Sequence, residues 1–131
     1  MILGVVTSNA QAVIRLNVYG PRHQEGQIDG VIDTGFDGSL TLPPRMIATL
    51  SLVWRRRGRA LLGDGTESIF DIYEAALDWD RELRRIAVDE ADATPLVGMA
   101  LMSGYELRIP VVVGGTASLE HLPQKLADPG I

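Results

Sequence analysis

The sequence predicts a mostly β fold, a small barrel or sandwich with two short helices. Apolar side chains recur at every second position in several segments, which is the period of a half-buried strand. Clusters of turn-forming residues separate these segments at regular spacing, as in all-β domains. The length of 131 residues fits one domain, since single domains run to roughly 100–200 residues.

The composition excludes several classes of site and partner. Twelve Lys and Arg stand against 17 Asp and Glu, and the net charge of −5 argues against a nucleic-acid partner. The chain has no Cys, and therefore no disulfide, thiolate nucleophile or Cys-ligated metal. Residues 1–6 lack the basic start of a signal peptide, and no apolar run approaches the roughly 18–20 residues of a membrane span. We expect a cytoplasmic protein with no membrane partner, no metal and no cofactor.

The first half of the chain predicts four strands and one helix. In the second strand Ile14, Leu16 and Val18 share one face, which predicts that this face is buried. A helix over residues 45–50 follows Pro44, which suits a first helical turn because its missing N–H has no partner there. The predicted strands cover residues 2–7, 12–19, 27–33 and 40–42.

The second half predicts further strands, one hairpin and a short helix. Gly63-Asp64-Gly65 contains Asp-Gly, a strong signal for a hairpin turn. A short apolar stretch over residues 95–98 leads into a helix over residues 99–103, with Gly104 as its C-cap. The predicted strands cover residues 53–62, 69–79, 83–88, 105–113 and 116–122, and residues 123–131 are expected to be a loose tail.

Asp33-Thr34-Gly35 is the most informative motif. The apolar pair Val31-Ile32 delivers the Asp into a sharp turn, and an alternating Leu-Thr-Leu-Pro run follows at residues 40–43. A polar turn after a strand is the plain interpretation, because Asp, Thr and Gly are all common in turns. The two apolar residues before the motif and the alternating run after it make the motif more specific than the three residues alone.

The segment resembles the active-site motif of the retropepsin-like aspartic proteases, and above all their prokaryotic single-domain type. In that type a Phe follows the Asp-Thr-Gly, as Phe36 does in this sequence. Residues 96–99, Leu-Val-Gly-Met, are similar to the second signature of the family, and residues 63–65 fall where the family carries its flap. The resemblance implies a small closed antiparallel β-barrel with one or two short helices and a flap hairpin, spanning residues 1–122.

The same resemblance implies an aspartic endopeptidase. One Asp-Thr-Gly in so short a chain implies a homodimer, in which Asp33 of each copy forms the catalytic pair. Thr34 is expected to hydrogen-bond across the pair, and Gly35 to place its N–H near the carboxylate. Phe36 is expected to shape the nearest substrate pocket, and Gly63, Asp64 and Gly65 to close over an extended peptide or protein substrate.

Two alternatives stay open from the sequence. A catalytically silent dimeric peptide-binding module would keep the same motif, and so would an unrelated barrel in which Asp33 is only a turn residue. Two charged clusters are interpreted as solvated surface: the basic residues at positions 55–57 and 59 on a strand face, and the acidic residues at positions 89, 90 and 92 in a loop.

Overall fold

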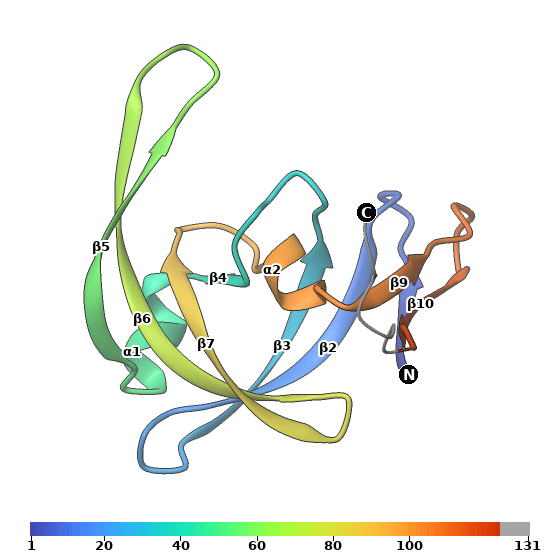
Figure 1. Cartoon of the computed structure of the whole chain (residues 1–131), viewed down its shortest axis with the longest axis horizontal. Coiled ribbons are helices and arrows are strands. Elements are labelled where there is room, and N and C mark those ends of the chain that lie inside the picture. The colour runs from blue at the N-terminus through green and yellow to red at the C-terminus, as the bar shows by residue number, and fades with distance from the viewer. Residues whose placement is uncertain (124–131) are drawn as a thin grey trace, which may run out of the picture.

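A ten-stranded mixed sheet forms most of the protein in the computed structural model, which describes residues 1–123 (Figure 1). The helices of this range are α1 (Pro44–Thr49) and α2 (Met99–Met102). The strands are β1 (Ile2–Val6), β2 (Ala12–Tyr19), β3 (Glu25–Ile32), β4 (Leu40–Leu42), β5 (Val53–Leu61), β6 (Glu67–Trp79), β7 (Glu82–Glu90), β8 (Leu96–Val97), β9 (Tyr105–Arg108) and β10 (Thr116–His121). The mostly β prediction is confirmed.

The sheet runs in the order β5-β6-β7-β4-β8-β3-β2-β1-β10-β9, and β2 also pairs with β6. Most neighbouring strands are antiparallel, but β3 pairs with β8 and β4 pairs with β7 in parallel. The antiparallel sheet that the resemblance implies therefore holds for most strand pairs but not for these two. The short strands β4 and β8 enter through long connections rather than hairpins, and such connections permit parallel pairing.

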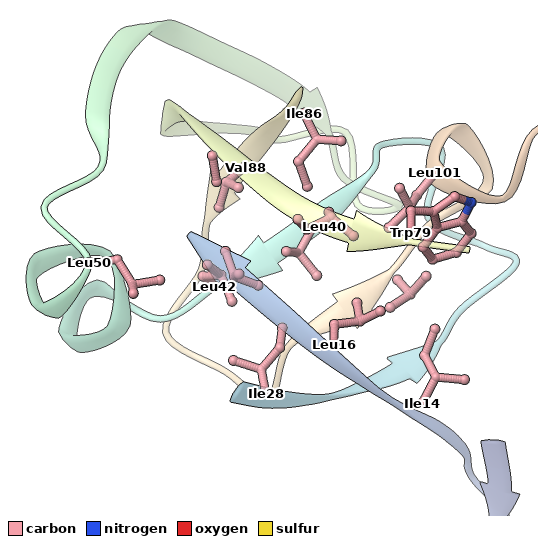
Figure 2. Close-up of a cluster of buried hydrophobic side chains, with 14 of the residues drawn as sticks. Ile14, Leu16, Ile28, Leu40, Leu42, Leu50, Trp79, Ile86, Val88 and Leu101 are labelled. Carbon is pink, nitrogen blue, oxygen red and sulfur yellow. The ribbon is translucent and has the colours of Figure 1, made fainter. Parts of the chain in front are cut away.

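The core fills the inner face of this sheet. Ile14, Leu16 and Val18 are buried, as the alternation in β2 predicts. Figure 2 shows two of them packed with Leu40 and Trp79 from other strands. Burial of each such aliphatic side chain contributes roughly 1.5–3 kcal/mol. Alternation in β6 turns every second residue inward, so its remaining side chains form an outer face.

One predicted strand is shorter than expected. The strand predicted over residues 105–113 ends at Arg108, and residues 109–115 form a turn. Pro110 has no N–H to give to a sheet, and its carbonyl accepts a hydrogen bond from the Val112 N–H at 2.8 Å. The Gly114 N–H donates to the Val6 carbonyl at 2.8 Å, which joins this turn to β1.

The other predicted elements occur within a few residues of their expected ends. The tail predicted over residues 123–131 lies, apart from its first residue, outside the described range. No helix among residues 1–123 is long and apolar enough to cross a membrane.

Candidate active site

Asp33 lies directly after β3, where the strand turns sharply. Its N–H donates to the Val97 carbonyl at 2.9 Å, which extends the parallel pairing with β8 by one step. The Gly35 N–H donates to Asp33 Oδ1 at 2.9 Å, and the Phe36 N–H donates to the Asp33 carbonyl at 3.2 Å. The half-buried carboxylate is therefore oriented by the backbone of its own turn, as expected for Gly35. Thr34 is exposed at the tip.

The second predicted motif holds the first one in place. After β8, the Gly98 N–H donates to the Ser39 carbonyl at 2.9 Å, and the Met99 N–H donates to the Phe36 carbonyl at 2.8 Å. The Ala100 N–H donates to the Gly38 carbonyl at 3.1 Å. Three backbone N–H groups of residues 98–100 thus bind carbonyls of the loop at residues 33–39. The two sequence motifs are therefore in direct contact.

Glycine is required at the contact between these motifs. A Cβ on Gly98 would lie 2.1 Å from the Gly38 carbonyl oxygen and 2.6 Å from Phe36 Cδ2. A Cβ on Gly38 would lie 2.5 Å from the far end of the same Phe36 ring. The half-buried ring therefore packs on two glycines, and part of its surface supports the loop rather than facing an open pocket.

Thr41 is a supporting residue that sequence reasoning missed. Its side chain is buried in the middle of β4, and its Oγ1 accepts a hydrogen bond from the Leu96 N–H at 2.8 Å. This bond ties β4 to the start of β8, beside the Asp33 turn. The one available signal was a polar residue between Leu40 and Leu42, which the period-two pattern assigns to the exposed face.

Asp89 is a second such residue, and its predicted placement in a solvated loop is wrong. It lies in β7, half-buried, and its Oδ2 would lie 3.3 Å from a Cβ on Gly38. Burial raises the pKa of the Asp89 carboxyl, the Arg56 charge opposes this, and the Asp37 charge adds to it. The sheet register places Asp89 beside Thr41, so the pairing of β7 with β4 brings the carboxyl next to Gly38 in the loop of residues 33–39.

The predicted hairpin at residues 63–65 is confirmed as the turn between β5 and β6. The Leu62 N–H donates to the Thr66 carbonyl at 2.7 Å, and Gly65 has a φ of +87°, which favours glycine. Asp64 Oδ1 accepts from the Thr66 N–H at 2.9 Å and from Thr66 Oγ1 at 2.6 Å, and these bonds lower the pKa of the Asp64 carboxyl. The Asp64 carboxylate thus stabilises its own turn.

The hairpin of β5 and β6 extends well beyond the rest of the sheet (Figure 1). It projects from the same edge as the loop of residues 33–39, which connects β3 to β4 in the upper part of that view. Leu61 and Ile69 near its end are largely exposed.

The basic cluster on β5 pairs with acidic residues across the hairpin. Arg57 Nε lies 3.7 Å from Asp71 Oδ1, and Arg59 Nη1 lies 3.9 Å from Glu67 Oε2. These side chains are mostly exposed, and such pairs contribute about 0–1 kcal/mol each. The arrangement fits the predicted solvated strand face.

Comparison with known proteins finds a match among solved structures. The chain is similar to a crystal structure of a retropepsin-like aspartic protease from Rickettsia conorii, with a TM-score of 0.57. The match covers 90% of this chain and 90% of that chain at 15% sequence identity. No protein-family model matches the sequence, and no curated protein matches it. The chain therefore has the fold of a retropepsin-like aspartic protease.

Proposed function

We propose that the protein is an aspartic endopeptidase that acts as a homodimer, with one Asp33 from each copy. The observation that carries this proposal is the Asp33 carboxylate, oriented by the Gly35 N–H at the end of β3 within the retropepsin-like fold. The oriented carboxylate is the group that peptide hydrolysis by this class of enzyme requires.

The need for two carboxylates leads to the dimer. The chain contains one Asp-Thr-Gly, so a pair requires a second copy related by a two-fold axis. β9 is the last strand of the sheet, with an edge that has no neighbour among the described strands. Leu3 and Val5 of β1, which is separated from β9 by β10, are exposed. An open edge and exposed apolar residues are suited to pairing with the same strands of a partner.

The proposed reaction uses one proton shared by two carboxylates. Two carboxylates roughly 3 Å apart do not both ionise, which is a known property of aspartic proteases. The ionised Asp33 takes a proton from a water that attacks the scissile carbonyl carbon, and the protonated one donates its proton to the carbonyl oxygen. The Gly35 N–H holds one carboxylate oxygen, so the other is directed at the water. Thr34 at the exposed tip links the two turns across the axis.

The hairpin of β5 and β6 serves as the flap in this proposal. An extended peptide pairs with it as an added strand between the tip and the two Asp33 turns. Gly63 and Gly65 provide the backbone freedom for closure, and Asp64 keeps the turn intact. Phe36 shapes the substrate pocket with the exposed part of its ring. We also propose that pairing of β2 with β6 closes the sheet into a barrel, and that the protein acts in the cytoplasm.

Incubation with a mixed peptide library tests the proposal. The wild-type protein is expected to cleave extended peptides at mildly acid pH, with a bell-shaped profile because either loss of the shared proton or a second protonation stops the reaction. Asp33→Ala is expected to abolish cleavage. Absence of cleavage by a dimeric wild-type protein would favour the silent peptide-binding module. Equal cleavage by Asp33→Ala would show that another group does the chemistry.

Assembly gives an independent test of the shared proton. Two like charges at the axis make the dimer take up a proton on association, so dimerisation is favoured at low pH and weakened as pH rises. Asp33→Asn removes the repulsion, and its dimer is expected to persist at high pH. Sedimentation at micromolar concentration from pH 4 to pH 8 measures both. A strictly monomeric wild type that cleaves peptides would contradict the dimer.

A further inference from the structure

A cavity lies on the outer face of the sheet, remote from Asp33. Its volume is about 540 Å³, and it is centred where β6 passes between β2 and β7. Its far wall is the β2–β3 hairpin loop at the start of β3, whereas Asp33 follows the end of that strand. Because β3 has eight residues, the two sites are separated by about 25 Å along the strand. The cavity therefore lies outside the proposed peptide-cleavage site.

The hollow exists because one small residue faces outward among larger ones. Ala76 lies on the outer face of β6, paired with Tyr19 on one side and Arg85 on the other. Val53 of β5 and Leu83 of β7 stand beside it as exposed apolar walls. The volume falls within the range of about 300–1,000 Å³ that is usual for small-molecule sites.

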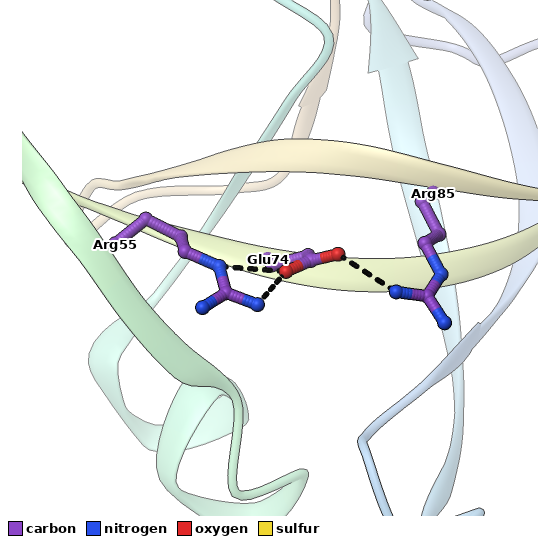
Figure 3. Close-up of polar contacts among 3 residues, drawn as sticks. All are labelled: Arg55, Glu74 and Arg85. Atoms are coloured by element: carbon purple, nitrogen blue, oxygen red, sulfur yellow. Dashed lines mark hydrogen bonds and ion pairs between the residues drawn. The ribbon is translucent and has the colours of Figure 1, made fainter.

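One end of this cavity carries an excess of positive charge. Glu74 lies between two guanidinium groups, as Figure 3 shows. Arg55 donates to Glu74 Oε2 through Nε at 2.6 Å and also through Nη2, and Arg85 Nη1 approaches Glu74 Oε1 at 3.4 Å. Two cations on one carboxylate leave one net positive charge. Each guanidinium has five N–H donors, so several remain available to a ligand, above all on the mostly exposed Arg85.

The opposite end of the cavity is polar, but its Tyr19 hydroxyl and Asp78 carboxylate already hydrogen-bond to each other. Tyr19 Oη donates to Asp78 Oδ2 at 2.6 Å, and this bond raises the pKa of Tyr19 to about 12. The Asp78 carboxylate repels an anion at this end, and His23 lines the adjoining loop. An anionic group is therefore directed away from Asp78 and toward the two Arg residues.

We propose that this cavity binds a small amphipathic carboxylate, with its apolar body over Ala76 and its carboxylate on Arg85 and Arg55. A planar carboxylate matches the paired N–H donors of a guanidinium, and the apolar walls exclude water from the rest of the ligand. The proposal does not depend on the cleavage activity, because no residue of the cavity belongs to the loop of residues 33–39.

Titration with octanoate, followed by amide chemical shifts, tests the proposal. Saturable shifts are expected around Ala76, and octanol and acetate are each expected to bind at least tenfold more weakly, since each lacks one half of the recognised chemistry. Arg85→Gln is expected to weaken octanoate binding at least tenfold, because a charge-assisted bond is lost. Glu74→Gln is expected to strengthen it, because a competing carboxylate is removed. Arg57→Gln is the matched control, because Arg57 is an exposed arginine on β5, the strand of Arg55, but does not line the cavity, and this variant should bind as wild type does.

Several results would overturn this inference. They are the absence of saturable shifts, shifts centred elsewhere on the sheet, equal binding of octanol, or equal weakening by Arg85→Gln and Arg57→Gln. Ala76→Leu, which fills the hollow, provides a second test when its spectrum shows a folded chain. Retained binding by that folded variant would also exclude the cavity as the site. Arg85→Gln changes an exposed side chain and keeps the test decisive if Ala76→Leu fails to fold.

Discussion

Replacement of Gly98 by Ala is expected to destabilise the protein and to disable the proposed active site. The added Cβ would lie 2.1 Å from the Gly38 carbonyl oxygen, about 1.3 Å short of the 3.4 Å at which ordinary van der Waals contact begins. It would also lie 2.8 Å from the Phe36 carbonyl oxygen. Both of these oxygens belong to the backbone, which cannot rotate aside as a side chain does. The loop of residues 33–39 must therefore move.

The cost follows from overpacking and from lost hydrogen bonds. Overpacking costs about 1–3 kcal/mol, and the bonds from Gly98 to Ser39 and from Met99 to Phe36 contribute about 1 kcal/mol each. The free energy of unfolding should therefore fall by about 3–5 kcal/mol for Gly98→Ala. Urea denaturation at one fixed protein concentration measures this, because concentration affects the stability of a dimer.

Gly63→Ala is the matched control, since a Cβ there meets no atom within 4 Å. Its free energy of unfolding should stay within about 0.5 kcal/mol of wild type. The Gly98→Ala variant should also fail to cleave peptides when it is assayed without urea and at low temperature, where it remains folded. A Gly98→Ala protein as stable as Gly63→Ala would refute the argument that the two motifs are packed without spare room.

Three further predictions concern the supporting residues and the hairpin. Thr41→Val removes the acceptor of the Leu96 N–H and should lower the free energy of unfolding by about 1–3 kcal/mol, measured by urea denaturation; no change would mean that the N–H finds another acceptor. The raised pKa of Asp89 means that the native protein keeps this proton at pH values where the unfolded chain has lost it. Its contribution to stability therefore falls as pH rises from the unfolded pKa, near 3.9, through the raised native pKa. Asp89→Asn should raise the melting temperature at pH 7 and not at pH 3, and a lower melting temperature at pH 7 would show that attraction between Asp89 and the Arg56 charge dominates. Amides at residues 62–66 should exchange rapidly with solvent and become protected when a peptide-like aspartic protease inhibitor binds, and equal protection in both states would count against a flap.

The local pattern of the sequence predicts much of the fold. Alternation identifies the inward face of β2, with Ile14 and Leu16 buried. Asp-Gly between Gly63 and Thr66 identifies the turn of the long hairpin, because both its dihedral angles and its side-chain bonds are set within four residues. The Asp33 turn is predictable for the same reason, since its hydrogen bonds to Gly35 and Phe36 are local.

Features that depend on residues far away in the sequence cannot be predicted from the local pattern. The buried Thr41 is explained by Leu96, which is 55 positions away in the chain. Asp89 belongs to β7 because that strand pairs with β4 in parallel. The residues next to Asp89 in the sequence do not indicate this pairing. The early end of β9 has a local cause in Pro110, which the apolar run of Val111, Val112 and Val113 concealed.

The most direct test of the central claim is a mixing experiment between wild-type and Asp33→Asn protein. If each active site needs Asp33 from both copies, only wild-type homodimers cleave peptides. Equal amounts of the two proteins, exchanged to equilibrium, should then leave about a quarter of the cleavage rate of the same total amount of wild type, since random pairing makes that share of the dimers fully wild type. A rate of about half would contradict the account, because it is the result for chains that each carry a complete active site.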